Sequence, residues 1–179
     1  MVPTSQKRYI AAMRNVKRYF KRGNTYSLTH VTYQRSPILV QNIDLLWESI
    51  DKYRRSSPFS LVAWAILPDH WHCIVSPGKN DLATLMKKVK LSFAMRFLKR
   101  QGLSSGRVWQ NRYWDHIIRD QQDLNRHIDY IHYNPVRHGV VDSSLDYPHS
   151  SFSDFVDRGL YESTWGAVDS VRLEGDFGE

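Results

Sequence analysis

Two histidines stand on either side of a tryptophan in the stretch LPDHWHCIVS, residues 67–76. Side chains of a β-strand alternate between its two faces, so His70 and His72 would share one face while Trp71 and Cys73 pack on the other. Two imidazoles at this spacing are suited to bind one divalent metal ion. The alternative is an exposed strand face that carries two histidines without a ligand, because a His-x-His pair alone is a weak motif. Cys73 would be a buried, unreactive thiol.

A second group of polar side chains lies in DLNRHIDYIHYN, residues 123–134, where the apolar spacing is that of a helix. Tyr130 and Asn134 are four residues apart, so both lie on the same side of that helix. The asparagine could complete a metal site formed by the histidine pair, and a bound metal ion polarises a phosphoryl oxygen. Tyr130 could then attack phosphorus and form a covalent phosphotyrosine. The alternatives are a surface tyrosine and a polar helix end before Pro135.

The surrounding pattern predicts the elements that would hold these two groups. Strands are predicted at 25–34, 59–66, 70–76 and 107–119, and helices at 40–55, 81–100 and 123–134. The last helix is expected to end at Asn134, before Pro135. The order β-α-β-β-α-β-α resembles a ferredoxin-like antiparallel sheet with helices on one face. We therefore expect an α+β fold with an extra, tyrosine-bearing helix and a C-terminal extension.

Charge is distributed unevenly along the 179 residues. The net charge is +7 and the pI is about 9.6, with eight Lys or Arg and no acid in residues 1–43, whereas residues 142–179 hold nine acids and two bases. We expect a basic N-terminal arm at 1–22, a catalytic domain at 23–141 and an acidic C-terminal extension at 142–179. A polyanionic partner is expected, and aromatic residues beside basic ones favour unpaired nucleic-acid bases. The alternative is a basic protein without such a partner.

Cysteine content and hydropathy argue against a disulfide-stabilised protein and against a membrane-spanning one. A single cysteine allows no internal disulfide, and no apolar run approaches the roughly 20 residues that span a bilayer. The basic N-terminal stretch also lacks the continuous apolar core of a signal peptide. A cytoplasmic location, associated with the nucleoid and without a membrane partner, is therefore expected.

Four blocks of the sequence resemble those of the HUH single-strand DNA nucleases and, among them, the REP-associated tyrosine transposases. In chain order, they are LPDHWHCIV with its HWH motif, VWQNRYWDHIIRD at 108–120, DYIHYNPVRHGVV at 129–141 and YPHSSFSDFVDRGLYESTW at 147–165. The resemblance implies a ferredoxin-like catalytic domain. It also implies metal-dependent cleavage and rejoining of single-stranded DNA at REP-type palindromes, which form hairpins.

The resemblance further implies roles for individual residues. His70 and His72 would be metal ligands with Asn134 as the third, and Tyr130 would be the nucleophile that becomes joined to the 5′ phosphate. The ion would be Mg²⁺ or Mn²⁺, and tighter binding of Mn²⁺ is expected because this ligand set is softer than Mg²⁺ usually prefers. Tyr133 is the competing tyrosine, but an adjacent helical position points about 100° away from the side that carries Asn134.

Basic residues are candidates for DNA contact, mostly to phosphates. The candidates are Arg14, Lys17, Arg18, Lys21, Arg22, Arg119 and Arg137, together with the basic residues of 81–100. The acidic extension could fold over this surface and mimic DNA, which is a hypothesis of autoinhibition. A monomer is favoured by the resemblance, with a dimer as the alternative.

Three other functions are alternatives to the transposase. They are a REP-hairpin-binding protein without cleavage activity, an HUH replication initiator or relaxase, and a metal phosphodiesterase that does not use the tyrosine. The joint presence of histidine pair, tyrosine and asparagine argues against the first. The tyrosine block and the short chain argue against the second.

Overall fold

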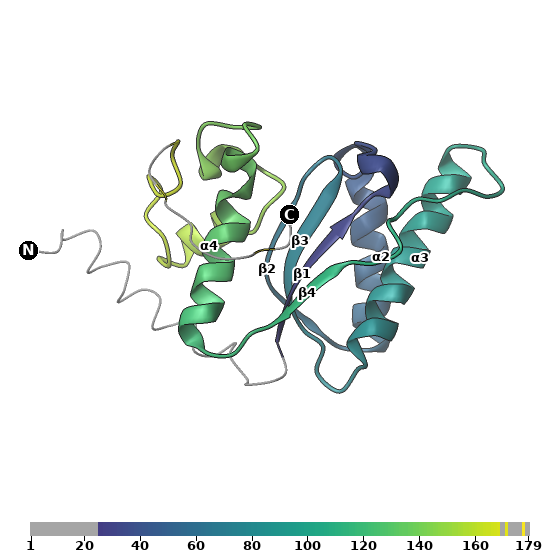
Figure 1. The fold of residues 1–179 in the computed structure, drawn as a ribbon, viewed down its shortest axis with the longest axis horizontal. Helices are drawn as coiled ribbons and strands as arrows, with labels where there is room; N and C mark the ends of the chain where they lie inside the picture. Colours follow the sequence, from purple (N-terminus) through teal and green to yellow (C-terminus); the bar gives the residue numbers. More distant parts are fainter. Residues whose placement is uncertain (1–24, 169–170, 172–176, 178–179) are drawn as a thin grey trace, which may run out of the picture.

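A four-stranded antiparallel sheet forms the centre of the computed structural model, which describes residues 25–168, 171 and 177 (Figure 1). The strands lie in the order β2-β3-β1-β4, with β1 at Tyr26–Val31, β2 at Ser60–Ile66, β3 at His70–Ser76 and β4 at Trp114–Ile117. The helices are α2 at Ile43–Ser56, α3 at Leu82–Arg100, α4 at Gln121–Arg137 and α5 at Phe152–Asp157. No helix within the described residues is both long and apolar enough to cross a membrane.

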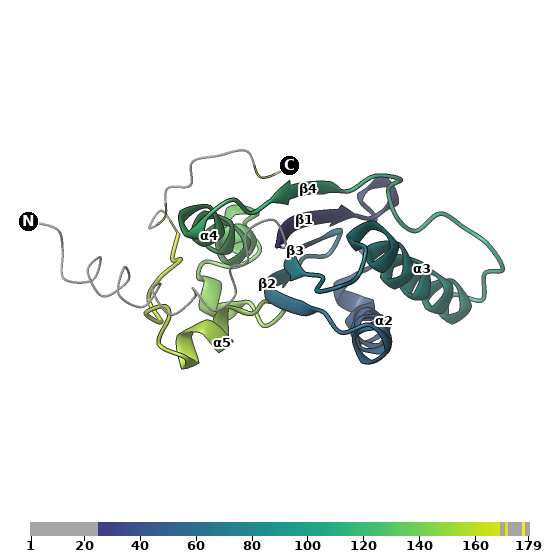
Figure 2. The same cartoon turned by 90° about the horizontal axis from the view of Figure 1, so that it is seen from below.

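Helices cover both faces of this sheet. Figures 1 and 2 show α2 and α3 together on one face and α4 on the other, with the short α5 beside α4. The order β1-α2-β2-β3-α3-β4 with strand order β2-β3-β1-β4 is the ferredoxin-like arrangement, and α4 is the additional helix. The predicted α+β fold class is confirmed.

Strand β3 divides its side chains between the two layers. Trp71, Cys73 and Val75 are buried in the core beneath α2 and α3, and Trp71 has no exposed surface. The neighbouring Ile74 belongs instead to the core beneath α4. This alternation directs the histidines of β3 towards α4, because they occupy the same face as Ile74.

Helix α4 continues past Pro135, so the predicted end of the helix at Asn134 is wrong. The helix runs to Arg137, with the proline in its last turn. Proline has no backbone N–H to donate to the carbonyl of Ile131, so the last turn of α4 forms without that hydrogen bond. The cap residue His138 and then Gly139 follow the helix; the positive φ of Gly139, 65°, suits a residue without a side chain, and Val140 N–H donates to the carbonyl of Pro135.

The predicted strand at 107–119 is largely wrong, because only Trp114–Ile117 form a strand. The ladder between β1 and β4 stops at the pair Thr29 and Trp114, and the next contact is an isolated bridge between Thr32 and Trp109. Two more residues separate the tryptophans than separate the threonines. The two additional residues between Trp109 and Trp114 have no partners on β1 and must bulge out of the sheet, which interrupts the strand.

The segment after residue 142 contributes to the core on the α4 face. Phe152 and Phe155 of α5 are fully buried there, together with Leu160 and Tyr161. Earlier in this segment, the hydroxyl of Tyr147 donates to the backbone carbonyl of Ile66 at the end of β2 over 2.7 Å. Residues 147–161 of the C-terminal extension are therefore packed on the side of the sheet that α4 covers.

Candidate active site

The imidazole of His70 is oriented by the residue before it. Asp69 Oδ1 accepts a hydrogen bond from His70 Nδ1 over 2.6 Å, and the other carboxylate oxygen of Asp69 accepts from Arg35. Burial pushes the pKa of Asp69 upwards, but the bonds from His70 and Arg35 outweigh it and hold that pKa below its usual value. With Nδ1 used in this way, His70 Nε2 faces Asn134 Oδ1 at 3.2 Å.

Strand pairing orients the second histidine. The register between β1 and β3 places Thr29 opposite His72, and Thr29 Oγ1 lies 2.9 Å from His72 Nδ1. The hydroxyl of Thr29 also lies 3.5 Å from the carbonyl of Phe177. A neutral His72 that donates from Nδ1 to this hydroxyl has its lone pair on Nε2. The two imidazole rings stand almost perpendicular, at 85°, with centroids 4.9 Å apart.

The imidazole nitrogens of His70 and His72 and the amide oxygen of Asn134 are suitable ligands for a divalent metal ion. In neutral His70, Nε2 and the Asn134 amide oxygen are both acceptors, and two acceptors 3.2 Å apart need a proton or a cation between them. Asp69 and Thr29 supply the outer hydrogen bonds that usually orient metal-bound histidines. The side chains of His70, His72 and Asn134 are all buried, so the set is preformed.

Tyr130 lies beside this group of ligands. Its ring meets the ring of His72 edge to face, with centroids 5.3 Å apart, and it is 2 % exposed. Arg137, two turns along α4, donates from Nη1 to the phenol oxygen over 3.0 Å, and its guanidinium carbon lies 5.4 Å from the ring centroid. Phe177 stacks on the tyrosine ring at 4.1 Å and 8°.

The competing Tyr133 points to another part of the molecule. Its ring lies 6.4 Å from the ring of Trp165 in the C-terminal extension and is partly exposed. The structure thus brings His70, His72, Tyr130 and Asn134 together and leaves Tyr133 outside the group.

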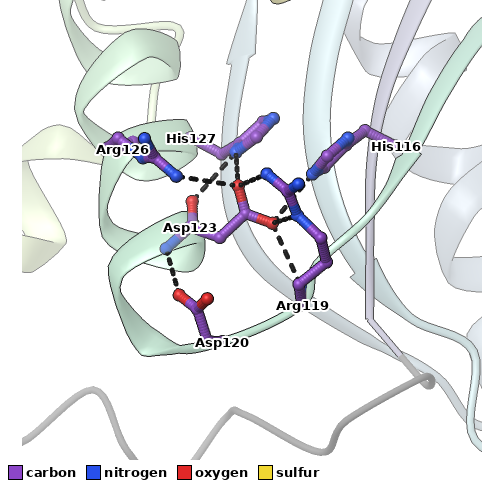
Figure 3. Close-up of polar contacts among 6 residues, drawn as sticks. All are labelled: His116, Arg119, Asp120, Asp123, Arg126 and His127. Atoms are coloured by element: carbon purple, nitrogen blue, oxygen red, sulfur yellow. Dashed lines mark hydrogen bonds and ion pairs between the residues drawn. The ribbon is translucent and has the colours of Figure 1, made fainter. Parts of the chain in front are cut away.

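A second polar cluster surrounds Asp123 at the start of α4 (Figure 3). The helix begins here because Asp120 accepts a hydrogen bond from the Asp123 backbone N–H over 2.8 Å. The buried Asp123 carboxylate accepts from His116 Nε2 at 2.8 Å and from Arg119 Nε at 3.1 Å. Although burial raises its pKa, these bonds dominate and lower it far below the usual value. The cluster ties α4 to β4.

This Asp123 cluster does not have the geometry of a metal centre. Ligand atoms of His116, Asp123 and His127 do lie within 4.8 Å of one another. The two imidazole rings, however, are stacked at 15° with centroids 4.5 Å apart. A metal bound at about 2.0–2.1 Å lies close to the plane of each imidazole, and stacked rings share no such plane. The cations of Arg119 and Arg126 also face the same carboxylate.

Five of the predicted DNA contacts lie outside the described residues. These are Arg14, Lys17, Arg18, Lys21 and Arg22. Arg119 is bonded to Asp123 with its side chain 66 % exposed, and Arg137 contacts the tyrosine. On α3, Arg96 and Arg100 pair with acids of α2, which leaves Lys87, Lys88 and Lys99 as exposed charges of that helix.

Sequence reasoning missed three contributors to the site. Asp69 carried a signal, since a carboxylate directly before a histidine motif is placed to orient its imidazole. Thr29 and Phe177 carried none, because contacts between residues far apart in the sequence bring them to the site.

A ferredoxin-like sheet with a His-x-His strand, facing a helix that bears tyrosine and asparagine, defines the class of HUH nucleases and transposases. Residues 21–134 match the family described as IS200-like transposases. The chain belongs to this family and is therefore an enzyme that cleaves and rejoins single-stranded DNA.

Individual relatives agree with this family. The chain is 36 % identical over 156 residues to the REP-associated tyrosine transposase of Escherichia coli strain K12. This match covers 86 % of this chain and 91 % of the relative. It is 35 % identical over 178 residues to a putative REP-associated tyrosine transposase of Haemophilus influenzae, covering 92 % and 100 %. A solved REP-associated tyrosine transposase bound to a REP hairpin matches with a TM-score of 0.75 and 36 % identity, over 90 % of this chain and 94 % of that one.

Proposed function

We propose that this chain cleaves and rejoins single-stranded DNA at REP-type hairpins, with Tyr130 as the nucleophile and with a divalent ion held by His70, His72 and Asn134. The observation that carries the proposal is the convergence of two separate elements. Strand β3 presents two imidazoles of defined orientation, and α4 presents an amide oxygen 3.2 Å from one of them and a phenol beside the other. Arg137 contacts the oxygen that would react.

The reaction follows from this placement. A bound ion would polarise a phosphoryl oxygen of the DNA strand. The phenol oxygen of Tyr130 loses its proton to water and attacks phosphorus, and the bond from phosphorus to the 3′ oxygen breaks. The leaving 3′ oxygen takes up a proton from water, so that a free 3′ hydroxyl and a 5′-phosphotyrosine result. Rejoining is the reverse, in which a 3′ hydroxyl attacks the phosphotyrosine and the phenol leaves. Arg137 can hold the phenol oxygen in both directions.

REP-type hairpins are the proposed substrate because a relative of 36 % identity has been solved with a REP hairpin. The net charge of +7 suits a polyanion. Mn²⁺ or Mg²⁺ is the proposed ion, because two imidazoles and an amide oxygen leave further positions for water and phosphate oxygens. A basic arm at 1–22, a catalytic domain at 23–141, an acidic extension at 142–179, a monomeric state and a cytoplasmic location with the nucleoid complete the proposal.

The test is covalent capture of DNA. Labelled single-stranded DNA with a REP-type hairpin and unpaired flanks is incubated with Mn²⁺ and the protein, and adducts are resolved under denaturing conditions. We expect an adduct with the natural protein and with Tyr133→Phe, and none with Tyr130→Phe. An adduct lost only in Tyr133→Phe would overturn the choice of nucleophile. Binding without any adduct would instead support a hairpin-binding protein.

A further inference from the structure

Phe177 fills a ring-sized slot between the nucleophile and the start of α4. One face of its ring stacks on Tyr130 at 4.1 Å and 8°. Its ring also meets the ring of His127 edge to face, with centroids 5.2 Å apart. Phe177 is only 9 % exposed, so the slot is enclosed. A flat, enclosed space beside a tyrosine ring matches the shape of a nucleobase, which stacks on aromatic faces in this way.

One wall of the slot carries a hydrogen-bond acceptor that the phenylalanine cannot use. His127 Nδ1 donates to the backbone carbonyl of Asp123 over 2.9 Å, which places the lone pair on Nε2. This Nε2 is buried, and no hydrogen-bond partner meets it among the described residues. Figure 3 shows it pointing away from the Asp123 carboxylate. Burial of the ring lowers the pKa of His127, which keeps the acceptor neutral.

An unsatisfied buried acceptor is costly in a folded protein and is explained when a ligand supplies the missing donor. Phenylalanine supplies none, whereas the edge of every natural DNA base carries at least one N–H. A DNA base could therefore donate a hydrogen bond to His127 Nε2, whereas the phenylalanine ring can only pack against this histidine.

We propose that this slot binds one unpaired DNA base close to the cleaved phosphate, with Tyr130 as the stacking face and His127 Nε2 as acceptor for an N–H of the base. Phe177 stands in for that base in the present structure. The inference rests on the proposed function and deepens it, because it adds a base-binding residue that lies outside the metal ligands.

Further cations and rings border the slot. His127 stacks on His116, and His116 stacks on Trp114 at 5.9 Å and 7°. The exposed guanidinium of Arg119 lies beside them, bonded to Asp123. Stacked rings with a neighbouring cation are the features that hold single strands, so this row provides a path for the nucleotides that follow the bound base.

The test measures binding, so it does not depend on cleavage. Tyr130→Phe keeps the stacking ring and prevents covalent reaction. 2-Aminopurine is placed in turn at each unpaired position beside the hairpin, and its fluorescence is recorded with this protein. We expect quenching at one position, and stronger quenching when Phe177→Ala is added. Equal quenching at all positions, or no increase with Phe177→Ala, would refute the slot.

The role of His127 is tested by removing the donor from the base. At the quenched position, adenine is compared with purine, which has the same rings without the amino group. We expect adenine to bind about three- to tenfold more tightly, the value of one neutral hydrogen bond. The preference should disappear in His127→Phe and persist in His127→Gln, which keeps an acceptor. The same preference in both variants would contradict the proposal. A missing covalent adduct would reject the proposed function while these binding ratios still decide the slot.

Discussion

Arg137 and Tyr130 are joined by a hydrogen bond of 3.0 Å from the guanidinium Nη1 to the phenol oxygen. The two residues are seven positions apart on α4, which places them on one side of the helix after two turns. Sequence analysis predicted that Arg137 contacts DNA phosphate. The structure places it on the atom that the proposed reaction uses, where a positive charge stabilises negative charge on the phenol oxygen as it leaves.

Replacing this arginine should therefore impair chemistry more than binding. In Arg137→Gln we expect the rate of adduct formation at saturating DNA to fall about 100-fold, the usual effect of losing a preorganised donor at a reacting oxygen. Arg137→Lys should recover part of the rate because it keeps the charge. The DNA dissociation constant should change little. A large loss of affinity with an unchanged rate at saturation would show that Arg137 acts as a phosphate contact and not on the phenol.

Asp69 should control metal affinity without being a ligand. The carboxylate holds His70 Nδ1 at 2.6 Å, and loss of such an outer hydrogen bond typically weakens metal binding 10- to 100-fold. We expect this decrease in Asp69→Asn, measured by calorimetric titration with Mn²⁺. Asp115→Asn is the matched control, because Asp115 is an exposed acid on β4. Equal affinities in the two variants would show that Asp69 does not orient the histidine.

Local sequence spacing was sufficient for the residues that lie on one element. The alternation in β3 and the four-residue spacing in α4 predicted the directions of His70, His72, Tyr130 and Asn134. Contributions from elsewhere were not predictable, since Thr29 reaches His72 through the register of two strands 43 residues apart. The length of a strand also depends on its pairing partner, as the interrupted pairing of β4 with β1 illustrates.

The carboxylate of Asp123 should stabilise the position of α4. Its side chain is 2 % exposed and bonds to His116 and Arg119, and breaking a buried charge network commonly costs about 3–5 kcal/mol. We expect Asp123→Asn to lose about 3 kcal/mol of unfolding free energy at pH 7. The loss should be much smaller in Asp120→Asn, because asparagine also caps a helix. Denaturant unfolding followed by circular dichroism measures both.

The same comparison has a pH signature. The pKa of Asp123 is lowered in the folded protein, so its stabilising contribution is complete above the unfolded value of 3.8 and is lost as the pH falls below it. The difference in stability between the natural protein and Asp123→Asn should therefore begin to shrink below about pH 4 and shrink further towards the lowered folded pKa. A constant difference between pH 7 and pH 3 would mean that the charge of Asp123 is not what stabilises the helix.

His132 should make the protein acid-sensitive by the opposite route. Burial lowers its pKa from 6.5 to about 3, and its Nε2 bonds to the hydroxyl of Ser151 over 2.9 Å. Between these two values the unfolded chain binds a proton that the folded chain resists. Protonation of this histidine in the unfolded chain should thus lower the unfolding free energy by about 1.4 kcal/mol for each unit by which the pH decreases in this range. His132→Gln should show a shallower decline from pH 6.5 to 4, and parallel curves for both proteins would contradict the assignment.

Removing the end of the acidic extension should increase cleavage. Deletion of the whole of 142–179 is unsuitable, because it removes Phe152 and Phe155 from the core. Deletion of 169–179 spares these residues and removes Phe177, which covers one face of Tyr130. We expect faster adduct formation, measured at limiting DNA.

Two further variants distinguish inhibition by the ring of Phe177 from inhibition by the negative charge of the tail. Phe177→Ala should reproduce most of the increase if the ring blocks the nucleophile. Conversion of four acids to amides should reproduce it if the tail mimics DNA by charge; these are Asp169, Glu174, Asp176 and Glu179. Because Phe177 is the residue that contacts Tyr130, we expect the alanine variant to have the larger effect. If the deletion leaves both DNA affinity and adduct formation unchanged, the extension does not inhibit the enzyme.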